Sequence, residues 1–187
     1  MTHAKLIDTD IDHSLLESEI HQLIDQHQLH DQNQISLTSI TGNNDWLCSI
    51  GKLAKLPYPE RYYGTLNSAL SGTYIEQCIS RYSIYYRWRL LKLTPGSTYS
   101  IHKDIRANGD LNIRLHIPVV TNPRAYLMFF DSLPEWSENS ASFYHLEAGN
   151  TYEVNTSGMH TAVNFSTSHT RYHIVGVKYE NSNNWDY

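Results

Sequence analysis

A histidine and an aspartate stand two residues apart at His102 and Asp104, and a further histidine, His160, follows after enough chain for several strands. On an extended segment, residues i and i+2 point to the same face, so His102 and Asp104 could reach one metal ion together. A ligand from a distant strand, His160, would complete a triad of two histidines and one carboxylate. Such a triad leaves one face of the metal open and is typical of non-haem Fe(II) oxygenases.

Arg171 follows His160 after room for one strand, a turn and the start of the next strand. In such a hairpin, Arg171 would lie beside the metal ligand across the ladder. A guanidinium group presents a planar fork that binds a carboxylate through two parallel hydrogen bonds. A metal ion that chelates one end of a keto diacid, with Arg171 on the far carboxylate, is the arrangement expected for 2-oxoglutarate.

A second arginine and histidine, Arg114 and His116, are again two residues apart and are expected to share one face of a strand. The alternating residues Ile113, Leu115 and Ile117 are expected to face the core. Taken alone, Arg114 is more simply interpreted as an exposed strand residue. His116, taken alone, is more simply interpreted as a core histidine that donates to a backbone carbonyl.

The elements that must position these residues are predicted to be helices followed by strands. Apolar residues at helical spacing predict a helix over about residues 12–29, capped by Asp10 or Asp12, and a second helical region within 65–80 that Gly72 could split. Residues 82–93 are rich in aromatic and aliphatic side chains and predict a long strand. Short strands separated by turn signals then suggest a sandwich or barrel; they are expected at 98–103, 111–119, 125–131, 142–147, 151–155, 160–165 and 171–179.

Bulk composition indicates a globular protein. The 187 residues favour one domain, with 40% hydrophobic and 18% charged residues. The net charge of -5 and the absence of a dense basic stripe argue against nucleic acid as a partner. No signal peptide and no membrane-length apolar run is seen, so the expected location is cytoplasmic. Cys48 and Cys78 permit a disulfide, but two cysteines do not suggest a disulfide-stapled scaffold.

Several motifs together resemble the aspartyl/asparaginyl β-hydroxylase family, in the form of its small bacterial or phage-type members. The motifs cover about residues 85–180 in the family's order and spacing: His102-Lys-Asp104, Arg114-Leu-His116-Ile-Pro118, Thr121-Asn122-Pro123, His160-Thr-Ala-Val-Asn164 and Arg171-Tyr-His173. One departure is Leu91, where family members can use a polar residue on the strand before the HxD turn.

The resemblance implies a mainly β fold with N-terminal helices, built on a double-stranded β-helix (a cupin-like jelly-roll). We expect a single domain over 1–187, in which a helical part, 1–81, packs on a catalytic core, 82–180. The resemblance implies His102, Asp104 and His160 as iron ligands and Arg171 as the site for the distal carboxylate of 2-oxoglutarate. It also implies Arg114 and His116 near the metal-chelating end of this co-substrate.

The predicted activity is that of an Fe(II)- and 2-oxoglutarate-dependent dioxygenase that uses O2, hydroxylates an unactivated C–H bond and releases succinate and CO2. The expected substrate is a small-molecule amino acid, a peptide or a protein side chain; the sequence predicts no oligomeric state. Candidate substrate contacts are Arg106, Arg124, Trp88 and Asn164. The main alternative is a non-catalytic jelly-roll that binds or senses a metal or diacid, and a cupin-like isomerase or dioxygenase is a third hypothesis.

Overall fold

A computed structural model describes residues 2–51, 55–104, 111–130 and 141–180. The helices are α1 (His13–Gln26), α2 (Tyr74–Ser80) and two short 3-10 helices, η2 (Glu60–Tyr62) and η3 (Ser68–Leu70). The strands before the predicted core are β1 (Ala4–Asp8), β2 (Gln34–Ser36), β3 (Thr38–Ser39) and β4 (Thr65–Leu66). The later strands are β5 (Tyr86–Leu93), β6 (Leu111–Val120), β7 (Ala125–Phe130), β8 (Ala141–Tyr144), β9 (Thr151–Asn155), β10 (Met159–Asn164) and β11 (Arg171–Glu180).

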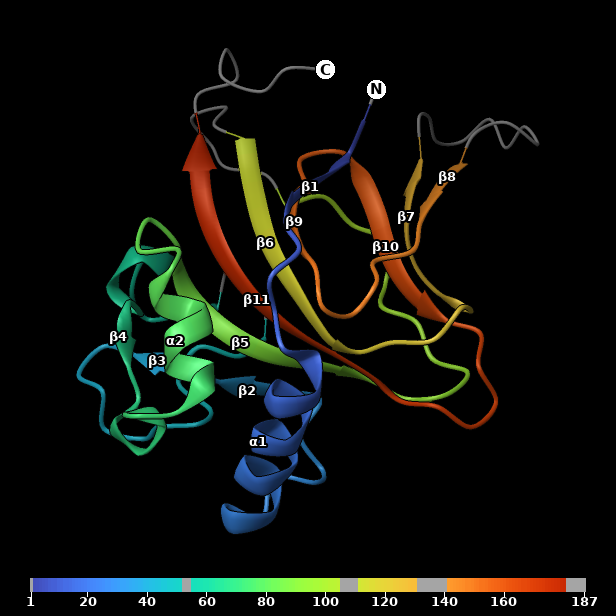
Figure 1. The fold of residues 1–187 in the computed structure, drawn as a ribbon. Coiled ribbons are helices and arrows are strands. Elements are labelled where there is room, and N and C mark those ends of the chain that lie inside the picture. The colour runs from blue at the N-terminus through green and yellow to red at the C-terminus, as the bar shows by residue number, and fades with distance from the viewer. Residues whose placement is uncertain (1, 52–54, 105–110, 131–140, 181–187) are drawn as a thin grey trace.

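The largest element is a six-stranded antiparallel sheet with the order β1-β9-β6-β11-β5-β2 (Figure 1). Strand β11 lies between β5 and β6, and the long, curved β6 and β11 run through the middle of the sheet. Side chains alternate between its two faces, as strand geometry requires. Leu115, Ile117 and Ile174 on one face are fully buried in the main hydrophobic core.

Helices α1 and α2 pack on this apolar face of the sheet. Asp12 caps α1, because its side chain accepts a hydrogen bond from the backbone N–H of Leu15 at 3.0 Å. The buried side of α1 carries aliphatic residues at helical spacing: Leu16, Ile20, Leu23 and Ile24. Each such side chain removed from water contributes about 1.5–3 kcal/mol, so this stripe fixes the helix against the sheet.

A three-stranded sheet with the order β10-β7-β8 faces the other side of the large sheet. The segment before the HxD motif runs along the free edge of β10, where Thr98 pairs with Val163 and His102 pairs with His160. A second core cluster lies inside this two-sheet arrangement; it contains Leu93, Leu127, Phe129, Leu146, Val154 and Ala162. Two facing antiparallel sheets of this kind form a jelly-roll, which confirms the predicted fold class.

The predicted elements agree in kind with the observed ones and differ mostly at their ends. Helix α1 is shorter than 12–29, and α2 occupies only the last part of 65–80, because Gly72 adopts a φ of 80° between η3 and α2. Residues 98–103 form isolated bridges instead of a regular strand. The description of residues 1–81 as helical was incomplete, since this part also supplies β1 and β2 to the large sheet.

Both cysteines are free thiols, so the disulfide that the sequence permitted does not form. In the part of the chain that the structure describes, each helix is too short or too polar to cross a bilayer.

Candidate metal centre and anion cavity

His102 and His160 are cross-strand neighbours. The backbone N–H of His102 donates to the carbonyl oxygen of His160 at 3.0 Å, and the reverse hydrogen bond measures 2.9 Å. Directly opposed residues on antiparallel strands have neighbouring side chains. The two imidazole rings accordingly lie with their centroids 4.4 Å apart. The pairing of the 98–102 segment with β10 therefore brings together two histidines that are far apart in sequence.

Each histidine has one ring nitrogen occupied by a backbone carbonyl. Nδ1 of His102 lies 2.7 Å from the carbonyl oxygen of Ser100, and Nδ1 of His160 lies 2.9 Å from that of Gly158. A carbonyl oxygen only accepts, so Nδ1 carries the hydrogen in both rings. The lone pair of each ring is then on Nε2, and this pattern is common among histidines that bind metals.

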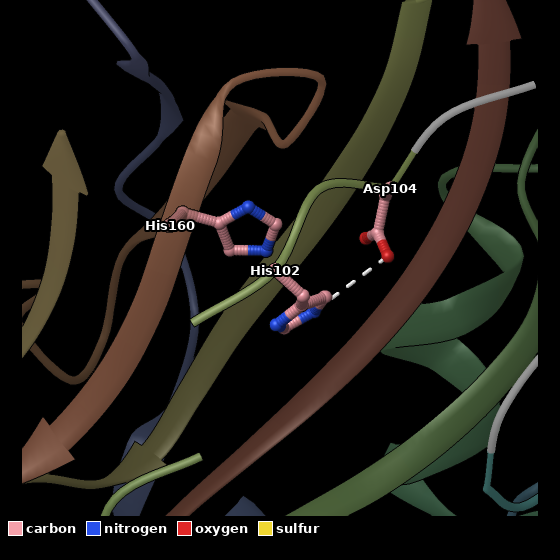
Figure 2. Close-up of side chains that lie close together, drawn as sticks. All are labelled: His102, Asp104 and His160. Carbon is pink, nitrogen blue, oxygen red and sulfur yellow. Dashed lines mark ion pairs between the residues drawn. The ribbon is translucent and has the colours of Figure 1, made fainter. Parts of the chain in front are cut away.

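Asp104 completes the cluster. Its backbone N–H donates to the carbonyl oxygen of Thr156 at 3.1 Å, which fixes the chain beyond the HxD motif. Asp104 Oδ1 lies 3.7 Å from Nε2 of His102 (Figure 2). One potential metal-ligand atom from each of His102, Asp104 and His160 lies within 4.8 Å of the others. Among the described residues, this is the one group of three or more potential ligands close enough to share a metal ion.

The surroundings of Asp104 and His160 favour the forms of these side chains that bind a metal. Burial alone would raise the pKa of Asp104, but the positive charge and hydrogen bonds of Arg114 outweigh it and hold that pKa well below its ordinary value. Burial lowers the pKa of His160 to about 4. A carboxylate and a neutral imidazole are the forms that bind a metal, so these side chains fit a divalent cation at neutral pH.

Arg114 occupies only one oxygen of the Asp104 carboxylate. Its Nε and Nη2 both donate to Oδ2, at 3.1 and 3.0 Å. Arg114 Nη1 lies 3.6 Å from Glu60 Oε1, and the same glutamate oxygen accepts a hydrogen bond from Arg87. This buried chain of alternating charges orients Asp104 and leaves Oδ1 turned toward the two histidines.

The triad opens into a cavity of about 690 Å³ between the two sheets. Its lining includes Arg87, Arg89, Arg114 and Arg171, together with His116 and Tyr99. A second cavity, of about 720 Å³, lies away from the triad, beside Cys48, Tyr58 and Tyr62. The cavity at the triad is the one that combines potential metal ligands with cationic side chains.

Arg171 is 3% exposed, and no described carboxylate lies within ion-pair distance of it. Its Nη2 contacts Nδ1 of His173 at 3.3 Å, and its Nε has no hydrogen-bond partner among the described residues. Burial lowers the pKa of Arg171 to about 10, so the guanidinium is still charged at neutral pH. A buried, charged fork with a free donor fits the carboxylate of a bound ligand.

His116 and His173 form a buried pair beside this arginine, with their Nδ1 atoms 3.3 Å apart. Burial lowers the pKa of both rings well below the ordinary value, so both are neutral. Arginine can only donate, so Nδ1 of His173 accepts from Arg171 and the hydrogen of that ring is on Nε2. The prediction that Arg114 and His116 share one face is confirmed, because both line the cavity.

The expected hairpin between His160 and Arg171 was wrong. Strand β10 pairs with β7, whereas β11 pairs with β5 and β6, so the two strands belong to different sheets. Arg171 pairs with Leu93 and reaches the cavity from the large sheet. The chain crosses between the sheets at the corner after Asn164, whose Nδ2 donates to the carbonyl oxygens of Leu93 and His169.

Three of the four candidate substrate contacts are not among the residues that line this cavity. Trp88 is 1% exposed and packs in the core against Gly176. The side-chain amide of Asn164 donates hydrogen bonds to backbone carbonyls at the sheet corner. Arg124 is exposed beyond the cavity lining. The fourth candidate, Arg106, lies outside the described residues.

Sequence reasoning missed Glu60, Arg87 and Arg89. The two arginines lie on β5, which was interpreted as an apolar strand, although charges two residues apart in such a strand indicate a polar inward face. Glu60 had no comparable signal, because it comes from a 3-10 helix far from the motifs.

Comparisons with solved structures support the fold at low sequence identity. HygX from Streptomyces hygroscopicus, crystallised with iron bound, gives a TM-score of 0.56 at 10% identity over 97% of this chain and 83% of that chain. AviO1 from Streptomyces viridochromogenes Tue57 gives 0.55 at 10% identity, over 96% and 90%. SnoN, a non-heme alpha-ketoglutarate-dependent epimerase from nogalamycin biosynthesis, gives 0.52 at 12% identity, over 96% and 78%.

No family model and no curated protein matches the sequence. The structural likeness establishes the double-stranded β-helix fold for this chain, and the chemistry has to be argued from its own residues.

Proposed function

We propose that the protein is an Fe(II)- and 2-oxoglutarate-dependent dioxygenase that hydroxylates an unactivated C–H bond of an amino acid, a peptide or a protein side chain. The observation that carries the proposal is one cavity that holds both the His102–Asp104–His160 cluster and the buried Arg171, which has no described carboxylate within ion-pair distance. The first feature fits the ligand set of a non-haem iron site. The second fits the far carboxylate of a diacid.

In this proposal, Nε2 of His102, Nε2 of His160 and Oδ1 of Asp104 hold Fe(II). Bound iron supplies the chemistry that couples O2 reduction to oxidative decarboxylation of 2-oxoglutarate, giving succinate and CO2, and to hydroxylation of the substrate. Arg171 binds the distal carboxylate and fixes the orientation of the co-substrate. Arg114 and His116 border its metal-chelating end. HygX, which has the same fold, has also been crystallised with nickel and 2-oxoglutarate bound, which supports this assignment.

The apolar part of the wall has a role of its own. Leu127, Ala162 and Val175 line the cavity between the polar groups. Such residues exclude water from the reacting atoms and strengthen the electrostatic contacts inside the site.

The finer assignment, to the aspartyl/asparaginyl β-hydroxylase family, is also a proposal. It is supported by Arg114 and His116 on one inward strand face, with Arg114 hydrogen-bonded to the proposed carboxylate ligand.

Succinate release tests the proposed function. Purified protein with Fe(II), 2-oxoglutarate and O2 is screened against the proteinogenic amino acids and short peptides, with His160→Ala as the control. We expect substrate-dependent succinate formation in the wild type and none in the variant. A non-catalytic binding or sensing protein would bind metal and 2-oxoglutarate without releasing succinate for any substrate, and that result would contradict the proposal.

A further inference from the structure

Arg89 is a second buried guanidinium in the cavity that the proposed chemistry does not use. It lies on β5, paired with Ser36 of β2 and Val175 of β11, and it is 6% exposed. Val175 also pairs with His116 of β6, so Arg89 belongs to the same row of the sheet as His116. Arg89 therefore faces the space in front of the triad from the large sheet.

The charges around Arg89 are unbalanced. Arg114 pairs with Asp104 and Glu60, and Arg87 pairs with Glu60, but no described carboxylate lies within ion-pair distance of Arg89. Burial, followed by the positive charges of Arg87 and Arg114, lowers the pKa of Arg89 well below its ordinary value. Buried charges are normally paired, because the loss of hydration is costly.

The hydrogen bonds of Arg89 leave one edge of the guanidinium available. Nη1 donates to Oε1 of Gln34 at 3.1 Å, and this bond fixes the plane of the group. Nε is buried without a partner among the described residues, and no described group accepts from Nη2. The Nε–Nη2 edge is the same edge with which Arg114 holds Asp104. A carboxylate matches this edge through two parallel hydrogen bonds.

We propose that Arg89, oriented by Gln34, binds a carboxylate of the molecule that the enzyme hydroxylates, and that this molecule is a free amino acid and not an internal residue of a protein. This inference rests on the proposed function, in which Arg171 is already assigned to 2-oxoglutarate. A cavity of about 690 Å³ has room for two small molecules, since pockets of roughly 300–1,000 Å³ hold drug-sized ligands.

The test uses the visible charge-transfer band of the anaerobic protein loaded with Fe(II) and 2-oxoglutarate. Free L-amino acids and their primary amides are compared as probes, because the amide keeps the size of the acid but loses the negative charge and one acceptor oxygen. We expect at least one free acid to perturb the band of the wild type and its amide to act about ten- to a hundredfold more weakly, as for loss of a charge-assisted hydrogen bond.

Three variants separate the two anion sites. Arg89→Gln is expected to weaken binding of the free acid about ten- to a hundredfold and to leave the affinity for 2-oxoglutarate within about twofold. Arg171→Gln is expected to weaken the binding of 2-oxoglutarate instead. Arg124→Gln, which changes an exposed arginine outside the cavity, serves as the matched control and should change neither affinity.

A stability measurement excludes a purely structural role for Arg89. Because the variant removes an unpaired buried charge, the ligand-free Arg89→Gln protein should melt at or above the temperature of the wild type. The proposal is overturned if Arg89→Gln lowers the affinity for 2-oxoglutarate as much as Arg171→Gln does. It is also overturned if the amides perturb the band as well as the acids, or if no free acid perturbs it. Absence of the band itself would count against the proposed function and is a separate outcome.

Discussion

At the scale of single residues, the site depends on which atom each side chain leaves free. Backbone carbonyls hold Nδ1 of His102 and His160, and Arg114 holds one oxygen of Asp104. The atoms left free are two Nε2 and Oδ1, and one potential ligand atom from each of the three residues lies within 4.8 Å of the others (Figure 2). Groups that orient metal ligands in this way typically change metal affinity by about 10–100-fold when removed.

Arg171 provides a test at this scale. Arg171→Gln should raise the KM for 2-oxoglutarate by about ten- to a hundredfold, because it removes charge-assisted hydrogen bonds to the distal carboxylate. The KM of Arg171→Lys should lie between those of Arg171→Gln and the wild type, since lysine keeps the charge but loses the planar fork. Initial rates of succinate formation at varied 2-oxoglutarate measure the effect. An unchanged KM in Arg171→Gln would remove this residue from the co-substrate site.

At the scale of elements, η2 supports the site from the N-terminal part of the chain. Its Glu60 is 3% exposed and bonds Arg87 on β5, beside Arg114 on β6. Arg87 itself has a φ of 50°, next to the register shift between β5 and β11. A short 3-10 helix thus contributes the negative charge that balances two arginines behind the proposed metal site.

Glu60→Gln should therefore affect both stability and metal binding. Removing one partner of a buried ion pair leaves uncompensated charge and typically costs about 3–5 kcal/mol. We also expect metal affinity to fall by about 10–100-fold, because Arg114 loses a contact that holds it on Asp104. Urea denaturation and Co(II) titration measure the two effects. Glu147→Gln, at an exposed position, is the control; equal effects in both variants would contradict the assigned role of η2.

The close contact between β11 and β5 gives a second test of an element. A Cβ on Gly176 would lie 2.9 Å from three ring carbons of Trp88. Gly176→Ala should thus destabilise the protein by about 1–3 kcal/mol through overpacking. Gly64→Ala is a suitable comparison, because its Cβ would lie 3.7 Å from the nearest atom. Chemical denaturation of both variants measures the difference, and equal stability would show that the core adjusts around Trp88.

At the scale of the whole molecule, the two sheets hold the site between them. The triad comes from β10 and the segment beside it, whereas Arg89, Arg114 and Arg171 come from the large sheet. Ligands that contact both sheets should stabilise the folded state by mass action, by about 2.7 kcal/mol at a hundred times Kd.

This stabilisation can be measured by thermal unfolding under anaerobic conditions. Fe(II) with saturating 2-oxoglutarate should raise the Tm of the wild type by roughly 5–10 °C, since 1 kcal/mol corresponds to about 2–4 °C in a protein of this size. His160→Ala should show little of this increase. The same increase in both proteins would indicate that the ligands bind elsewhere.

The sequence allowed prediction of the residues that carry a local pattern. The spacing of His102 and Asp104, and the alternation of Arg114 and His116 with apolar neighbours, are set by strand geometry and were confirmed as shared faces. The pairing of strands is not a local property, and for that reason the expected β10–β11 hairpin was wrong.

Burial was equally hard to predict from sequence. Trp88 was predicted to contact the substrate but lies in the core, whereas Arg89 was not predicted as a site residue although it lines the cavity. The two residues are adjacent on one strand, so their side chains point to opposite faces of the sheet, and the face taken by one residue determines that of the other. Glu60 reaches the site only through the folded arrangement of the first 81 residues, which the motifs do not cover.

The most direct test of the proposed metal centre is the visible spectrum of the protein with Fe(II) and 2-oxoglutarate under anaerobic conditions. We expect a weak charge-transfer band in the wild type, which reports the co-substrate bound to the metal. Folded His160→Ala should lack it. Absence of the band from well-folded wild-type protein, or an unchanged band in His160→Ala, would contradict the assignment of His102, Asp104 and His160 as the iron ligands.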